Sequence, residues 1–122
     1  MGQTKGQGNV VKSHYTPRKG DFAALTFDPQ SGHEQRGRRP ALVISNDLFN
    51  QRTGLAFVCP LTNTDRKIPF HVKVPESCIL TGFVMVDQVK SVDFVARSAK
   101  FIDKAPPHLL AEVLAILDAC VY

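Results

Sequence analysis

Only one long helix can be predicted in this chain of 122 residues, and it lies at the C-terminal end. The prolines at 106 and 107 open it, because the N–H of a first-turn residue has no helical partner to lose. The helix extends to about Val121, and its polar stripe is narrow, consisting essentially of His108, Glu112 and Asp118. So broad an apolar surface needs more cover than one small sheet provides, which predicts a dimer.

The rest of the chain is divided into short segments with strand-like composition, separated by turn residues. Strands are expected at 20–27, 39–45, 55–62, 70–74, 83–92 and 97–102. Segment 39–45 is apolar after its first residue, as in a strand buried on both faces. A short helix capped by Asn46 or Asp47 should end before Thr53-Gly54. Together these elements predict a mainly β fold, a small barrel or strongly bent sheet with the C-terminal helix packed on it.

Pro60 interrupts one of these segments near its end. Proline has no N–H to donate to a sheet ladder, so this end of 55–62 is expected at an edge or a bulge.

Length and composition indicate one domain, which we assign to residues 14–122. Residues 1–13 begin with a Gly/Gln-rich stretch that has little to bury, and we predict a disordered extension there. Val10 or Val11 is a candidate for the natural first residue. The sequence has no run of about 20 apolar residues and no apolar signal-peptide core. We therefore expect a cytoplasmic protein without a membrane segment.

The composition also limits the chemistry. The odd number and wide spacing of Cys59, Cys78 and Cys120 fit neither a disulfide framework nor a paired-cysteine zinc site. We expect these cysteines to be small buried hydrophobes in a reducing compartment. Walker-type phosphate loops and His-Glu-x-x-His motifs are absent from the sequence, so no cofactor or metal is expected. The net charge of +4 permits binding to RNA or to an acidic peptide.

The most distinctive charges lie in a polar, glycine-bearing loop, where Glu34 stands among Arg36, Arg38 and Arg39. Pro40 biases Arg39 towards an extended conformation, which places this arginine at the start of a strand. Arginine recognises phosphate oxygens bidentately, and a glutamate can accept a proton. The loop and strand together have groups that can handle a phosphodiester. Solvated surface charge is the other interpretation of such a cluster.

Several motifs follow one another along the chain: Gly20-Asp21, Phe27-Asp28-Pro29, Gly32-x-Glu34-Gln35-x-Gly37-x-Arg39-Pro40, Cys59-Pro60-Leu61-Thr62 and Asp87-Gln88-Val89-Lys90-Ser91. Their order and spacing resemble the MazF/PemK family of toxin endoribonucleases from toxin–antitoxin pairs. The resemblance covers the chain from about Tyr15 to its end. It implies the SH3-like small β-barrel of the MazF and CcdB toxins, which are homodimers.

The resemblance also implies which residues act on RNA. Catalysis is expected from Glu34, Arg39 and Thr62, without a metal, by attack of the substrate's own 2′-hydroxyl on the adjacent phosphorus. The products would be a 2′,3′-cyclic phosphate and a 5′-hydroxyl. Glu34 would serve as the base, Arg39 as an electrostatic clamp that can act late as an acid, and Thr62 as a hydroxyl donor to the phosphate. His33 is a rival base, because the reference pKa of histidine lies near neutrality.

A further set of residues can contact RNA through stacking, amide hydrogen bonds or positive charge: Phe27, Gln35, Arg36, Arg38, Gln88 and Lys90. The remaining histidines, His14, His71 and His108, are scattered and expected at the surface.

The partner implied by the resemblance is an acidic, partly disordered antitoxin, similar to MazE, which would lie across the basic groove and displace the catalytic loop. The alternative is a non-enzymatic interaction protein on the same fold, as CcdB is. CcdB relies on a C-terminal tryptophan, whereas this chain has no Trp and ends in Cys120-Val121-Tyr122. A basic RNA-binding module without turnover is the third interpretation. Cleavage of labelled RNA separates the three.

Overall fold

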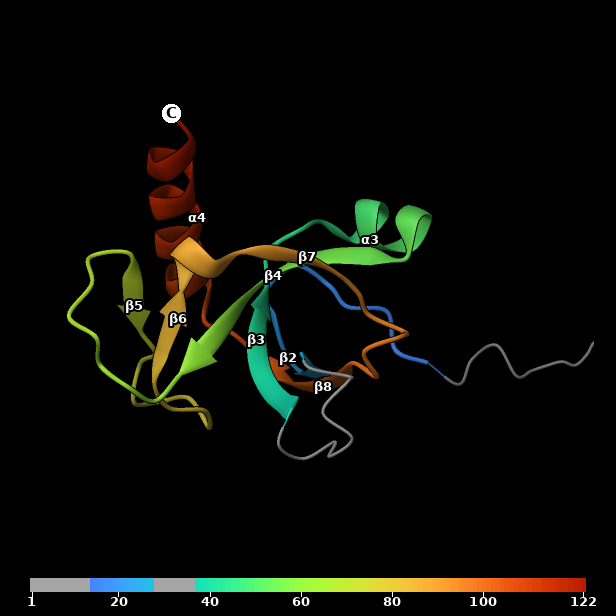
Figure 1. Cartoon of the computed structure of the whole chain (residues 1–122), viewed down its shortest axis with the longest axis horizontal. Coiled ribbons are helices and arrows are strands. Elements are labelled where there is room, and N and C mark those ends of the chain that lie inside the picture. Colours follow the sequence, from blue (N-terminus) through green and yellow to red (C-terminus); the bar gives the residue numbers. More distant parts are fainter. Residues whose placement is uncertain (1–13, 28–36) are drawn as a thin grey trace, which may run out of the picture.

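The computed structural model describes residues 14–27 and 37–122. The expected extension at 1–13 and the loop residues Glu34, Gln35, Arg36 and His33 lie outside the described residues. The elements in chain order are β2 (Asp21–Thr26), β3 (Arg38–Val43), α3 (Asp47–Thr53), β4 (Leu55–Thr62), β5 (His71–Lys73), β6 (Phe83–Met85), the 3₁₀ turn η2 (Val86–Gln88), β7 (Lys90–Asp93), β8 (Lys100–Lys104) and α4 (Pro107–Val121) (Figure 1).

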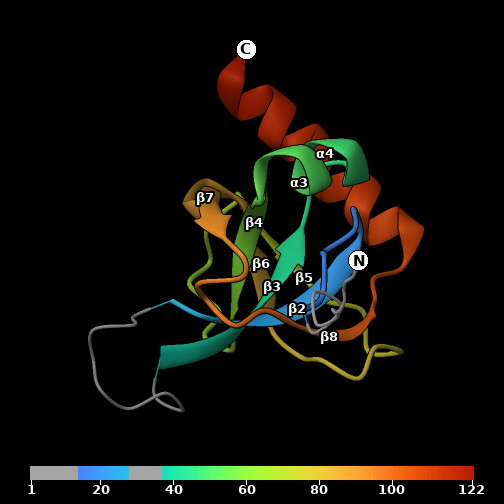
Figure 2. The same ribbon diagram turned by 90° about the vertical axis from the view of Figure 1, so that its right-hand side faces the viewer.

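The strands of the described part form one antiparallel sheet in the order β5-β6-β4-β3-β2-β8, with β7 added to β4. The sheet curves strongly without closing, and α4 lies along one side of it (Figure 2). The prediction of a mainly β fold with a C-terminal helix on a bent sheet is confirmed. No helix in 14–27 or 37–122 is both long and apolar enough to cross a membrane.

β4 is a central strand, and it changes partners along one of its sides. β3 covers one side, while β7 pairs with Leu55–Val58 and β6 with Leu61–Thr62 on the other. The carbonyl of Phe57 accepts a hydrogen bond from the N–H of Ile44, which follows β3, so the backbone groups of Phe57 point towards β3. Because backbone groups alternate in direction along a strand, the backbone nitrogen of Pro60, three residues later, points to the opposite side, where β7 and β6 lie. Pro60 therefore faces the break between β7 and β6, where no ladder bond requires its N–H. The expected edge position is wrong, and the break explains why proline is tolerated.

The expected long strand at 83–92 is also wrong, because η2 divides it into β6 and β7. The N–H of Val86 donates to the carbonyl of Phe70 at 3.1 Å, and Val89 N–H donates to the carbonyl of Val86 at 3.2 Å. The turn lets β6 and β7 pair with different parts of β4. Gln88 is the last residue of η2, and Lys90 is the first residue of β7.

The core occupies both faces of the curved sheet. Phe22 and Leu42 pack in one apolar cluster with Leu109 and Val113 of α4. Their strand neighbours pack in a second cluster: Ala23, Leu25, Ala41, Val43, Ala56, Val58, Val92 and Phe94. The alternation confirms that the apolar strand after Arg39 is buried on both faces. Even so, α4 leaves much apolar surface uncovered, with Val121 68% exposed.

Buried polar side chains fix the first segment of the fold. The Asp21 carboxylate, 1% exposed, accepts hydrogen bonds from the hydroxyl of Tyr15, the N–H of Arg18 at 3.0 Å and the amine of Lys104 at 2.5 Å. Burial and the bond to Asp21 raise the pKa of Tyr15. The Gly20-Asp21 motif therefore has a structural role.

Asn50 is a second buried anchor, located in α3. Its amide donates to the carbonyl of Pro17 at 2.8 Å and its side-chain oxygen accepts from the hydroxyl of Ser45 at 2.5 Å. The predicted cap is confirmed, because the Asn46 side chain accepts the N–H of Phe49 at 2.8 Å, and Gly54 ends the helix with a φ of 73°.

Candidate functional site

Arg39 and Thr62 lie together at the ends of neighbouring strands. Ala41 of β3 pairs with Pro60 of β4, which puts Arg39, two residues before Ala41, beside Thr62, two residues after Pro60. They line a pocket of about 160 Å³ whose other lining residues are Pro40, Leu61, Asn63 and Thr81. Hydroxyl, amide and guanidinium groups line this pocket, and none of its lining side chains within the described ranges 14–27 and 37–122 is a carboxylate. Such a set suits an anionic group.

The two arginines at the start of β3 have different tasks. The guanidinium of Arg38 donates to Thr26 Oγ1 at 3.0 Å, to the carbonyl of Ala24 at 3.2 Å and to the carbonyl of Ser98 at 3.0 Å. It therefore ties β3 to the end of β2. Arg39 is exposed and faces the pocket. Strand alternation separates these neighbouring side chains, so Arg39 is the one that can bind a ligand.

The hydroxyl of Thr62 is oriented by its own turn. Thr62 Oγ1 accepts the N–H of Thr64 at 3.2 Å, which leaves the hydroxyl hydrogen available as a donor. Gly82 packs against the backbone here. A Cβ at Gly82, where φ is +110°, would lie 2.3 Å from the carbonyl oxygen of Thr62. Glycine thus permits the close approach between the start of β6 and the end of β4 that fixes Thr62.

Phe27 and Lys90, both expected to contact RNA, form a second cluster. The Lys90 amine lies 5.1 Å from the centroid of the Phe27 ring, within the range of a cation–π interaction. The N–H of Phe27 donates to the carbonyl of Gly37 at 2.8 Å, and this bond joins the two described ends that flank residues 28–36. The guanidinium of Arg97 stabilises the backbone at the end of β2 by donating to the carbonyls of Thr26 and Phe27, at 3.1 and 2.9 Å.

Sequence reasoning missed Arg97, because nothing in its neighbourhood distinguishes it from a surface charge. It missed Asn63 and Thr81 for a different reason. These are ordinary turn residues until the fold brings them into the pocket with Arg39.

His71 is not the surface histidine that was expected. Its side chain is only 3% exposed, and Nε2 lies 3.0 Å from the Asp87 carboxylate. Its buried Nδ1 has no hydrogen-bond partner within the described residues. His71 therefore anchors η2, on which Gln88 is exposed.

The cysteines only partly fit the expectation of buried hydrophobes. Cys59 is buried, Cys78 is half-buried against the core, and Cys120 is exposed, which corrects the prediction for Cys120. Burial, with the nearby charge of Asp87, raises the pKa of the Cys59 thiol to about 12. Within 14–27 and 37–122, no group of three or more His, Cys, Asp or Glu side chains is arranged to hold a metal ion.

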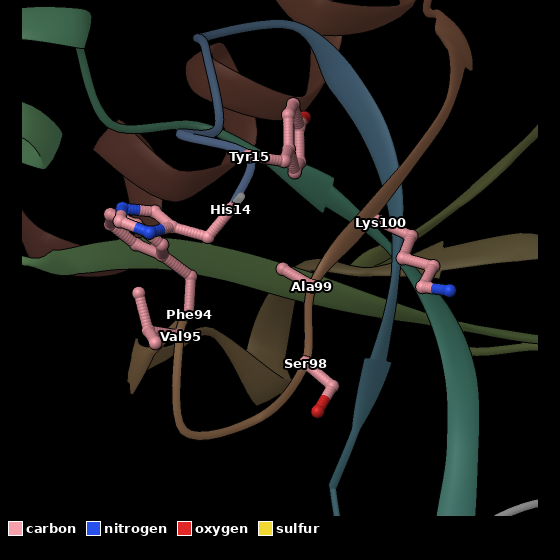
Figure 3. A pocket seen from close by; sticks show the side chains of 7 residues that line it. All are labelled: His14, Tyr15, Phe94, Val95, Ser98, Ala99 and Lys100. Carbon is pink, nitrogen blue, oxygen red and sulfur yellow. The ribbon is translucent and has the colours of Figure 1, made fainter. Parts of the chain in front are cut away.

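A larger cavity of about 320 Å³ shares no described lining residue with the pocket of Arg39 and Thr62. It is lined by His14, Tyr15, Phe94, Val95, Ser98, Ala99 and Lys100 (Figure 3). The rings of His14 and Phe94 lie at one end, and the Lys100 amine points away from them (Figure 3). Of the expected catalytic and RNA-contacting residues that the structure describes, none lines it. His14 and His108 are exposed, as predicted.

Comparison with known proteins agrees with the motifs. A family model for the PemK-like, MazF-like toxin of type II toxin–antitoxin systems matches residues 18–121. The endoribonuclease toxin ChpB of Escherichia coli (strain K12) is 42% identical over 117 residues, which cover 92% of this chain and 98% of ChpB. The endoribonuclease toxin MazF of the same strain is 35% identical over 109 residues, covering 89% and 97%.

Solved structures show the same fold. MazF from Deinococcus radiodurans in crystal form I has a TM-score of 0.79 and 41% identity, covering 88% of this chain and 97% of that chain. A MazE–MazF complex from the same organism, form III, gives a TM-score of 0.80 and 38% identity over the same shares. The chain therefore belongs to the PemK-like, MazF-like toxin family of type II toxin–antitoxin systems.

Proposed function

We propose that this protein is the endoribonuclease toxin of a type II toxin–antitoxin system and that it cleaves single-stranded mRNA in the cytoplasm at preferred sequences. The observation that carries the proposal is the pocket shared by Arg39 and Thr62. Two hydrogen-bond donors meet there at the ends of two neighbouring strands, where a phosphodiester can be held.

The reaction that suits these groups is attack by the substrate's 2′-hydroxyl on the adjacent phosphorus, which needs no metal and no activated water. Arg39 stabilises the charge on the non-bridging oxygens, and because a guanidinium group stays protonated in proteins, a clamp suits it better than a general acid. Thr62 donates its free hydroxyl hydrogen to the same phosphate. Glu34 accepts the proton of the 2′-hydroxyl, and the 5′-oxygen leaves, giving a 2′,3′-cyclic phosphate and a 5′-hydroxyl.

The flanking nucleotides are bound by residues around the pocket. Lys90 neutralises a phosphate beside the ring of Phe27, which can stack a base. Gln88, Gln35 and Arg36 provide further contacts to bases and phosphates. Arg38 is assigned a structural role instead, since protein oxygens occupy its guanidinium.

The positive charge of the chain and its exposed apolar groove suit two protein partners, an acidic antitoxin and a second copy of the chain. A solved relative from Deinococcus radiodurans is a complex of MazF with MazE, and an acidic antitoxin segment would compete with RNA for the basic side chains of Arg39 and Lys90. A second copy would cover the apolar side chains of a groove of about 310 Å³, which are Ile44, Phe57, Val89, Leu117 and Val121.

Labelled RNA tests the function. The purified protein should cleave it in EDTA at preferred sites. Arg39→Lys should retain charge yet lose most of the activity, because an ammonium cannot make the bidentate contact. Arg52→Lys, an exposed arginine on α3, is the matched control and should cleave normally. RNA binding without cleavage would favour a binding module, and failure of both would favour a toxin that binds a protein target.

A further inference from the structure

We propose that Asn63 is a specificity-determining residue, whose side-chain NH₂ donates to an acceptor atom on the base adjoining the scissile phosphate. The inference rests on the proposed function of the pocket shared by Arg39 and Thr62. It adds to that function the group that reads a base there.

Asn63 is well placed for such a contact. It directly follows Thr62 and lines the same pocket as Arg39, and its side chain is exposed. A phosphate held by Arg39 and Thr62 brings its adjoining nucleoside within reach of the next residue along the chain.

The orientation of the amide is set by a second segment of the chain. Thr81 Oγ1 donates to Asn63 Oδ1 at 3.0 Å. This hydrogen bond occupies one lone pair of Oδ1 and leaves both N–H groups of Nδ2 for a ligand. Gly82, next to Thr81, is packed against the carbonyl of Thr62 and against Asn63 Oδ1. The amide is thus held before any ligand arrives, which lowers the entropy cost of contact.

A base is a better ligand for this amide than a phosphate. The cationic and hydroxyl donors that suit an anion are already supplied by Arg39 and Thr62. The Nδ2 end of the amide presents only donors, so it distinguishes bases by where their acceptors lie, such as a carbonyl oxygen or a ring nitrogen, and disfavours an exocyclic amino group at the same place.

The test is the cleavage-site profile of a random-sequence RNA pool, with 5′ ends mapped for the wild type and for Asn63→Asp, Thr81→Val and Thr81→Ser. Asn63→Asp replaces the donors by acceptors, so one nucleotide beside the cut should change preference towards a base with an amino group, by about tenfold or more. Thr81→Val removes the bond that orients the amide and should broaden preference at that same nucleotide. Thr81→Ser keeps the hydroxyl and should retain the wild-type profile.

The outcomes separate this inference from the function itself. A wild type that cuts no RNA overturns the proposed function. A wild type that cuts at preferred sites, with Asn63→Asp giving the same profile at any overall rate, overturns the inference alone. A uniform loss over all sites also contradicts it, since it would show that Asn63 serves the phosphate or the fold.

Discussion

Nε2 of His71 in β5 lies 3.0 Å from Oδ1 of Asp87 in η2, and this contact connects the two elements. The backbone bond from Val86 to Phe70 connects the same two segments. Since η2 carries Gln88 and leads into Lys90, a buried histidine sets the position of surface residues proposed to contact RNA.

Removal of the Asp87 carboxylate should therefore destabilise the protein. Asp87→Ala leaves a buried imidazole without a partner among the described residues, which should lower the free energy of unfolding by about 1–3 kcal/mol. Glu76→Ala is the control, because its ion pair with Lys73 is exposed and is expected to contribute less than about 1 kcal/mol. Urea denaturation measures both. Equal effects of the two substitutions would show that the contact with His71 contributes no stability.

The buried carboxylate of Asp21 should be more important for folding than any surface charge. Asp21→Ala leaves Tyr15, Arg18 N–H and Lys104 without their common acceptor, and we expect a loss of about 2–4 kcal/mol. Asp47→Ala removes a half-exposed carboxylate that pairs with Arg18 and accepts the N–H of Lys19 at 3.1 Å, and it should cost only about 1 kcal/mol. Thermal and urea unfolding should give this order, and the reverse order would contradict the assigned role.

Gly82 should be needed for cleavage, because it lets β6 approach Thr62. An added methyl group would lie 2.3 Å from the Thr62 carbonyl oxygen, so Gly82→Ala must displace the strand end that carries Thr62. We expect lower stability and a fall in kcat of about tenfold or more, because catalytic geometry tolerates little displacement.

Gly54→Ala is the matched control for Gly82→Ala. Its φ is also positive, at 73°, but nothing lies within 4 Å of the added Cβ. It should cost about 1 kcal/mol of stability and retain kcat. Loss of activity in both variants would contradict a local effect at Thr62.

The thiol of Cys59 should be inert in the folded protein. Its pKa is raised to about 12, so the neutral form persists at every pH below that value, and the nucleophilic thiolate is scarce. Iodoacetamide at pH 8 should modify the exposed Cys120 first and Cys59 only after unfolding, as mass spectrometry of peptides would show. Rapid alkylation of Cys59 in the native state would contradict its burial.

The sequence predicts those parts of the structure that depend on local pattern. The bounds of β4, the caps of α3 and the length of α4 agree with periodicity, turn residues and proline placement. The division of 83–92 by η2 does not follow from composition, because its residues are strand formers on both sides, and only the two pairings with β4 require the break. His71 was expected at the surface because a histidine between apolar residues gives no sign of a partner sixteen residues away.

The residues of the candidate site could also be predicted only in part. Arg39 and Thr62 were singled out by motif resemblance, and the pairing of β3 with β4 brings them together. Arg38 and Arg39 are alike in sequence, and only the side of β3 that each occupies assigns one to the fold and the other to the pocket. Glu34 lies outside the described residues, so its role as the base stays a prediction.

The most direct test of the central claim uses one RNA that contains a preferred cleavage site and a second RNA in which a single 2′-deoxy sugar stands on the 5′ side of that site. Both should bind with similar affinity, because phosphates supply most of the binding free energy. Only the first should be cut, in EDTA, leaving a 2′,3′-cyclic phosphate and a 5′-hydroxyl. Cleavage of the deoxy-substituted RNA, or a strict requirement for Mg²⁺, would contradict the account.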